Sequence, residues 1–202
     1  MATTRGTRHF INMAAFLPHS ESNGPGARAV LWVQGCPIRC PGCFNAEFIP
    51  FRERTLIGIP DIADIILSLE HIEGVTFTGG EPFAQAGALA RLGRILQVAG
   101  KNIVTFTGYG YEDLARDPSN GDAAALLEVT DLLVAGPYSP EERKTLHFLT
   151  PELQGRVPDP ENLFGTAEYL IRQDGTVITT GFPSSAVPGC RETGFAPVPG
   201  GR

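Results

Sequence analysis

The sequence lacks any run of about 18 consecutive apolar residues, the length that a membrane-spanning helix requires. It also lacks a cluster of lysine and arginine, because its 16 basic residues are scattered and outnumbered by 22 acidic ones, for a net charge of −6. Proteins that follow nucleic-acid phosphates usually carry a basic stripe. We therefore expect neither a membrane nor a nucleic acid as a partner.

Cysteine is also scarce, with four residues in a chain of 202. Three of them, Cys36, Cys40 and Cys43, lie within eight residues, and Cys190 lies near the end. The apolar stretch near the N-terminus is too short for a signal peptide, so we predict a cytoplasmic protein. In that compartment clustered cysteines more often bind metal or carry out redox chemistry than form disulfides.

The rest of the composition is that of a globular protein, with 42% hydrophobic and 19% charged residues. Hydrophobic patterns predict strands over residues 9–17, 27–34, 75–78, 103–107 and 131–135, and a hairpin from 168–172 and 176–180. They predict helices on the stripes Ile62-Ile65-Ile66-Leu69 and Leu89-Leu92-Leu96-Ala99, and over residues 122–129. Alternating strands and helices predict an α/β fold with a mainly parallel sheet.

Glycine follows four of the predicted strands, at Gly35, Gly79, Gly108 and Gly136. Parallel strands joined by right-handed crossovers end at one edge of a sheet, and ligands bind at that edge. Glycine there allows a sharp turn and the close approach of a ligand. We therefore expect Cys36 to lie on a ligand-binding edge.

Three clustered cysteines fit some metal sites better than others. Structural zinc takes four protein ligands, usually as two pairs, but here a second cysteine pair is missing and the four histidines are scattered. Iron–sulfur clusters are bound by cysteine thiolates, normally four, so three would leave one iron open to a substrate or cofactor. An open iron–sulfur site is the favoured reading, with zinc or incidental thiols as alternatives. Cys190 is most simply an incidental thiol, but as a fourth ligand it would close the site.

Two motifs carry a resemblance to a known superfamily. The spacing Cys36-x-x-x-Cys40-x-x-Cys43 resembles the radical S-adenosylmethionine (SAM) signature, and Thr78-Gly79-Gly80-Glu81-Pro82 resembles its GGEP motif. The resemblance implies a [4Fe-4S] cluster on the three cysteines, with SAM bound to the unique iron. The Gly79-Gly80 backbone and Glu81 would bind the SAM amino group, with Pro82 keeping Glu81 extended. The reduced cluster would cleave SAM to a 5′-deoxyadenosyl radical.

The sequence around the third cysteine, where Gly42 and Phe44 flank Cys43, indicates a subgroup of the superfamily. Together with residues 106–109 and 131–137, it resembles the activating proteins of anaerobic (class III) ribonucleotide reductase, over residues 8–138. That resemblance implies a partial (βα) barrel and a glycyl radical installed on a partner enzyme. It also implies a low-potential electron donor such as flavodoxin or ferredoxin. Thr107 and Tyr109 would line the SAM pocket, although an ordinary strand end is an equally good reading.

Residues 139–148 depart from that family's pattern. We predict one domain over residues 1–183, with its core at 8–138 and a divergent part at 139–183, followed by a mobile tail at 184–202. A radical SAM enzyme that modifies a peptide or small molecule remains an alternative, as does a non-catalytic electron-transfer protein with Cys190 as a fourth ligand. The sequence has no further cysteine clusters, which favours the activating enzyme.

Overall fold

The structure is a computed structural model that describes residues 9–116, 120–139, 144–157, 167–171 and 177–181. The strands are β1 (Phe10–Ser20), β2 (Arg28–Val33), β3 (Thr55–Gly58), β4 (Gly74–Gly79), β5 (Asn102–Phe106), β6 (Leu132–Ala135), β7 (Thr145–Phe148), β8 (Ala167–Ile171) and β9 (Val177–Gly181). The α-helices are α1 (Ile59–Leu67), α2 (Ala86–Val98), α3 (Tyr111–Arg116) and α4 (Gly121–Glu128), and the 3-10 helices include η2 (Ala46–Phe48), η3 (Pro82–Gln85) and η4 (Pro151–Leu153).

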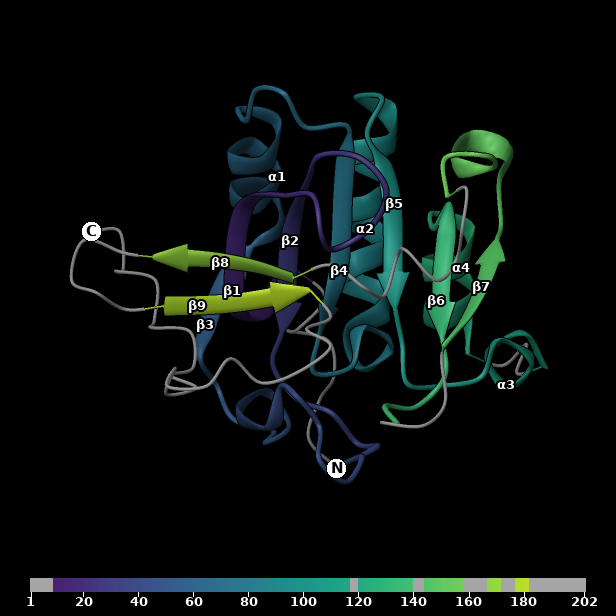
Figure 1. The fold of residues 1–202 in the computed structure, drawn as a ribbon. Helices are drawn as coiled ribbons and strands as arrows, with labels where there is room; N and C mark the ends of the chain where they lie inside the picture. Colours follow the sequence, from purple (N-terminus) through teal and green to yellow (C-terminus); the bar gives the residue numbers. More distant parts are fainter. Residues whose placement is uncertain (1–8, 117–119, 140–143, 158–166, 172–176, 182–202) are drawn as a thin grey trace.

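Seven strands form one sheet in the order β3-β1-β2-β4-β5-β6-β7 (Figure 1). The central strands β2, β4, β5 and β6 are parallel, as the sequence predicts. Strands β1 and β7 run the other way, because β1 pairs antiparallel with β2 and β7 pairs antiparallel with β6. Strand β3 pairs antiparallel with β1 and so runs in the same direction as the central strands. The fold is therefore mixed α/β with a mostly parallel centre, and the carboxyl ends of four strands share one edge.

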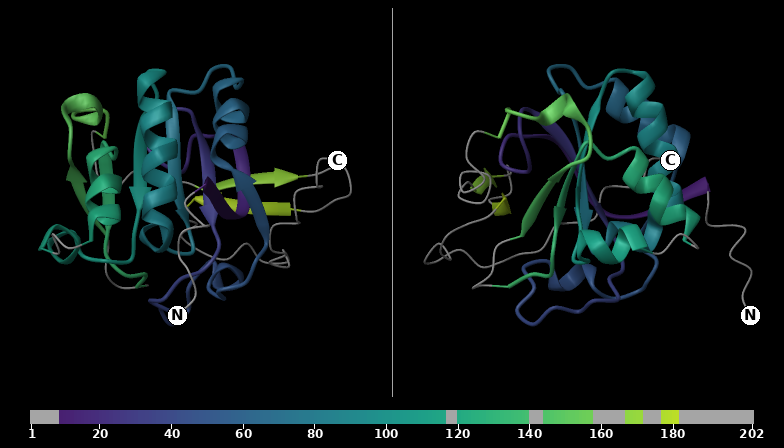
Figure 2. Two further views of the ribbon diagram at one scale, coloured as in Figure 1. Left: turned by 180° about the vertical axis from the view of Figure 1, so that it is seen from behind. Right: turned by 90° about the vertical axis from the view of Figure 1, so that its right-hand side faces the viewer.

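Helices α1, α2 and α4 cover one face of this sheet (Figure 2). Each of the two apolar stripes predicted for α1 and α2 contains a residue that is exposed in the structure. On α1 the buried residues are Ile59, Ile62, Ala63 and Ile66, whereas Ile65 is 43% exposed. Ala99 is an exposed C-cap beyond the end of α2. None of the helices in the described ranges combines the length and hydropathy of a membrane span.

The hairpin of β8 and β9 lies against the opposite face of the sheet (Figure 2). Leu170 packs on a buried apolar cluster that includes Trp32. Asn23 Nδ2 donates to Thr180 Oγ1 at 2.9 Å, which ties the hairpin to the loop before β2. The predicted hairpin is confirmed in its two strands, while residues 172–176 and the predicted tail at 184–202 lie outside the described residues.

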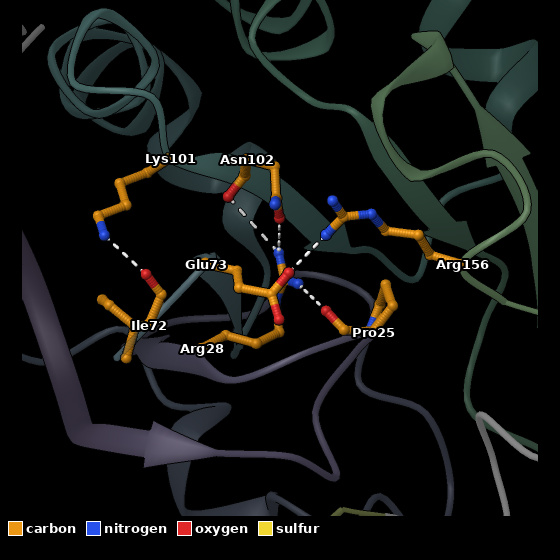
Figure 3. Close-up of polar contacts among 7 residues, drawn as sticks. All are labelled: Pro25, Arg28, Ile72, Glu73, Lys101, Asn102 and Arg156. Atoms are coloured by element: carbon orange, nitrogen blue, oxygen red, sulfur yellow. Dashed lines mark hydrogen bonds and ion pairs between the residues drawn. The ribbon is translucent and has the colours of Figure 1, made fainter. Parts of the chain in front are cut away.

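A buried arginine ties the amino ends of the parallel strands together (Figure 3). Arg28 is 0% exposed, and its guanidinium donates to Thr76 Oγ1 at 2.9 Å, to Asn102 Oδ1 at 2.6 Å and to Pro25 O. Burial lowers the pKa of Arg28 to about 10, against the opposing effect of Glu73 and other neighbours. This network connects β2, β4 and β5 at the edge opposite the cysteines.

Candidate metal centre

The cysteine loop lies at the edge where the four parallel strands end, at the bottom of Figure 1. Gly35 N donates to Phe48 O at 2.8 Å, and Cys36 N donates to Ile49 O at 2.9 Å. These bonds tie the start of the loop to η2 and the residue after it. The predicted placement of Cys36 on the carboxyl edge is therefore borne out by the structure.

The three cysteines share this loop as free thiols. Cys36 is buried, whereas Cys40 and Cys43 are partly exposed, and Cys43 N donates to Cys40 O at 3.3 Å. Burial raises the pKa of the Cys43 thiol, and the charges of Cys40 and Cys36 raise it further. A hydrogen bond from the Asn45 backbone and the charge of Lys144 act in the opposite direction. Cys43 thus lies close enough to Cys40 and Cys36 for their charges to affect its ionisation.

The chemistry of these donors fits an iron–sulfur cluster, which thiolates bind. Within the described ranges, no three Cys, His, Asp or Glu side chains are arranged around a single metal ion. Thiolates that bind a [4Fe-4S] cluster attach to different irons, so they need not converge on a single ion. The fit therefore rests on three reduced thiols carried by one loop. Cys190 lies outside the described residues.

Glu81 lies beside this loop and connects the ends of β4 and β5. Its side chain is 1% exposed, and its backbone is extended, as predicted for a residue before Pro82. Oε1 accepts from Phe83 N at 2.9 Å and from Thr107 Oγ1 at 2.8 Å, and Oε2 accepts from Gly108 N at 2.8 Å. Burial raises the pKa of the Glu81 carboxyl, while these hydrogen bonds and Lys144 counteract the rise.

We expect Glu81→Gln to destabilise the chain by about 1–3 kcal/mol, because the new amide NH₂ takes the place of an acceptor of the Gly108 N–H. The effect should depend on pH. Since the pKa of Glu81 is raised in the folded state, its ionisation removes stability as pH rises from about its ordinary 4.5 through that raised pKa. Denaturant unfolding at several pH values should therefore show the gap between wild type and variant narrowing as pH rises.

The control is Glu70→Gln, because the Glu70 side chain is 87% exposed. This variant should unfold at a denaturant concentration close to that of wild type, because an exposed side chain contributes little to stability. A gap for Glu81→Gln that stays constant across the pH series would contradict the assigned direction of the pKa shift.

The two motif glycines make room for protein backbone. Gly80 N donates to Val33 O at 2.7 Å, and Glu81 N donates to Gly35 O at 2.9 Å. A Cβ on Gly79 would lie 2.5 Å from Val33 N, and one on Gly80 would lie 2.4 Å from Gly35 O. Gly79 also has a φ of +108°, which disfavours other residues. The close approach here is that of β2 and the cysteine loop, whereas the sequence suggested that of a ligand.

We therefore expect Gly80→Ala to cost about 1–3 kcal/mol of unfolding free energy, because the methyl group meets a carbonyl that cannot rotate away. Gly121→Ala is the matched control, since nothing lies within 4 Å of a Cβ at that helical position. Thermal unfolding of both variants tests this prediction. If Gly80→Ala and Gly121→Ala had equal melting temperatures, the cysteine loop would have to move away from the new methyl group without loss of stability.

The sequence-predicted residues Thr107 and Tyr109 follow β5 at the same edge. Thr107 is buried, donates to Glu81 and accepts from Tyr109 N at 3.1 Å, so its hydroxyl organises the strand end. Burial raises the pKa of the Tyr109 hydroxyl, and the charges of Glu81 and Cys36 raise it further. Tyr109 thus lies within the electrostatic reach of the cysteine loop.

The remaining predicted residues frame the site. Thr78 pairs with Trp32 in the sheet, and Pro82 is buried as the first residue of η3. Gly42 has a φ of +68°, and the Tyr138 ring lies 4.0 Å from where its Cβ would be. Phe44 is 44% exposed. Phe44 and Tyr138 (38% exposed) therefore present aromatic surface on or beside the loop.

Lys144 also lies at this site, although its position in the charged run 141–144 predicts a solvated turn or, less readily, a partner contact. Its Nζ donates to Thr107 O at 2.9 Å and to Gly136 O, at the ends of β5 and β6. It precedes β7, a four-residue strand with no clear alternating pattern. Without that strand, nothing in the sequence brings Lys144 to the cysteines.

Known proteins match most of this described core. A family model for a 4Fe-4S single cluster domain matches residues 22–154. A protein of Salmonella typhimurium named anaerobic ribonucleoside-triphosphate reductase-activating protein is 33% identical over 133 residues, which cover 61% of this chain and 82% of the relative. The chain belongs to this family. Activating proteins of Vibrio cholerae (30% identity, 65% of this chain and 87% of the relative) and Enterobacteria phage T4 (29%, 63% and 81%) are also similar.

Membership of this family confirms the predicted resemblance to the activating proteins of anaerobic ribonucleotide reductase. The matched range contains the cysteine loop, Glu81 and Lys144. It ends at residue 154, before the β8–β9 hairpin. The β8–β9 hairpin, on the face of the sheet opposite the helices, therefore lies beyond the part matched by the 4Fe-4S domain model.

Proposed function

We propose that this chain is a radical SAM enzyme that installs a glycyl radical on a partner, an anaerobic ribonucleotide reductase in the first instance. The observation that carries the proposal is the juxtaposition of three free thiols with the Glu81 motif on one sheet edge, in a chain of the activating-protein family. We also propose that the sheet is the partial (βα) barrel of that superfamily.

Cys36, Cys40 and Cys43 would bind three irons of a [4Fe-4S] cluster and leave the fourth without a protein ligand. When bound and reduced by a low-potential donor such as flavodoxin or ferredoxin, the cluster would supply one electron to cleave SAM to methionine and a 5′-deoxyadenosyl radical, and this radical would remove a hydrogen atom from a glycine of the partner. The protein contributes position and charge.

Glu81 would orient the SAM amino group from the side of β4. A carboxylate offers about four acceptor positions, and three are taken by Phe83 N, Thr107 Oγ1 and Gly108 N. One acceptor position is left for an ammonium group. Because the three donors fix the carboxylate, it would need no reorganisation to bind. The Gly79-Gly80 backbone, Thr78, Pro82, Thr107 and Tyr109 complete the proposed SAM contacts, with Gly42 and Phe44 on the loop.

The test is anaerobic reconstitution with iron and sulfide, followed by reduction in the presence of SAM. We expect 5′-deoxyadenosine to form, SAM to perturb the electron paramagnetic resonance (EPR) spectrum of the reduced cluster, and a glycyl radical to appear on added anaerobic reductase. A chain that binds a cluster but neither cleaves SAM nor responds to it would overturn the proposal in favour of electron transfer.

One observation favours a second candidate. Residues 139–148 depart from the pattern of the activating proteins, and the hairpin of β8 and β9 lies beyond the matched range. A radical SAM enzyme that acts on a peptide or small molecule would retain the cluster edge and differ in these parts. SAM cleavage without a radical on any glycyl-radical partner would support this second candidate.

A further inference from the structure

Lys144 reaches the site because β7 runs antiparallel to its neighbour β6. Thr145 pairs with Ala135, the last residue of β6, so β7 begins at the edge where the parallel strands end. The residue before β7 is therefore placed at the same edge of the sheet as the cysteine loop. A lysine at the far end of β7 would lie at the opposite edge of the sheet.

Main-chain carbonyls fix the Lys144 ammonium in place. Nζ donates to Thr107 O at 2.9 Å and to Gly136 O, and Gly136 N in turn donates to Tyr109 O at 2.9 Å. An ammonium has three donors, and these carbonyls accept two of its hydrogen bonds without neutralising its charge. No carboxylate in the described part of the chain forms an ion pair with it.

The ammonium faces groups of the opposite charge. Burial lowers the pKa of Lys144, while Glu81 and the three cysteine thiolates raise it. Reciprocally, Lys144 lowers the pKa values of Cys43 and of Glu81. Lys144 is thus a partly buried cation at the sheet edge that carries the proposed cluster ligands, and it hydrogen-bonds to Thr107, the residue whose hydroxyl donates to Glu81.

We propose that the positive charge of Lys144 stabilises the reduced state of the cluster and thereby raises its reduction potential, a role that rests on the proposed function. Reduction adds one electron, and hence one negative charge, to the cluster. A fixed cation nearby favours that state electrostatically, and net charge around a cluster is a main determinant of its potential. Lys144 would act through its charge, while the three cysteines supply the ligands.

The experiment compares reconstituted wild type with Lys144→Arg, Lys144→Gln and Lys144→Met by potentiometric titration without SAM, monitored by EPR. The neutral variants should lower the ratio of reduced to oxidised cluster at a fixed potential on the order of tenfold, which is about 59 mV for a one-electron couple. Lys144→Arg retains the charge and should remain close to wild type. Lys144→Met keeps the apolar part of the lysine side chain, so it serves as the neutral variant if Lys144→Gln impairs folding.

Lys101→Gln is the matched control. Lys101 also donates to a main-chain carbonyl, Ile72 O at 2.6 Å, but at the opposite edge of the sheet (Figure 3). Its removal should leave the potential unchanged. A Lys144→Gln or Lys144→Met cluster with the wild-type potential would overturn the inference, as would a variant that only lowered the melting temperature or only weakened SAM binding. Failure of the wild type to bind any cluster would instead overturn the proposed function.

Discussion

Cys43→Ser is expected to abolish binding of the [4Fe-4S] cluster and, with it, all cleavage of SAM. Serine preserves the shape of the side chain but replaces the thiolate with a poor iron ligand. The remaining Cys36 and Cys40 would supply two protein ligands where the proposed site has three. Iron and sulfide content after reconstitution, the visible absorption of the cluster, and 5′-deoxyadenosine formation measure the loss.

Cys190→Ser is the matched control, since it removes the cysteine outside the loop. We expect this variant to bind the cluster and to cleave SAM as wild type does. Retention of a SAM-responsive cluster in Cys43→Ser would show that the loop is not the ligand set. Loss of the cluster in Cys190→Ser would instead identify a closed, four-cysteine site.

Arg28→Met is expected to destabilise the fold by about 3 kcal/mol, a large part of the usual 5–15 kcal/mol of a domain. Methionine fills a similar volume but leaves buried acceptors unpaired, among them Asn102 Oδ1 and Pro25 O. Those groups are sealed from water because Arg28 itself is 0% exposed. Urea unfolding followed by circular dichroism measures the change.

The control for this prediction is Arg94→Met. Arg94 forms an ion pair with Glu128 at 3.3 Å between two exposed side chains, which contributes little to stability. We expect the urea midpoint of Arg94→Met to lie close to that of wild type. A similarly small effect of Arg28→Met would mean that water or a rearranged side chain replaces the guanidinium. Because Arg28 lies at the edge opposite the cysteines, the folded fraction of Arg28→Met should still bind the cluster.

The parallel centre of the fold could be predicted because its signals are local. Strands β2, β4, β5 and β6 are short, largely apolar runs that end at a glycine or one or two residues before it, and alternation with helices implies parallel pairing. That one inference placed Cys36 at the same edge as the Gly79 turn. The site motifs lay within this part, so their proximity followed from topology without any knowledge of side-chain contacts.

The antiparallel edge strands could not be predicted in the same way. Strands β3 and β7 have four residues each, and β7 has no buried residue to reveal a period. Their positions are set by pairing with distant strands. Ile65 shows a related limit, since its spacing from Ile62 fits a helical face but the buried stripe of α1 runs through Ala63 instead. The role of Lys144 depended on β7 and was therefore missed.

The reversed direction of β7 has a consequence for how such a protein can diversify. Substitutions in the parallel strands disturb the core, since these strands are buried almost throughout. Lys144, directly before the edge strand β7, instead donates to carbonyls at the ends of β5 and β6 and so brings a charged group to the cysteine end. If Lys144 has the proposed role, mutation at this position would change the electron affinity of the centre without touching the buried strands, so the chemistry of the site could vary independently of the core.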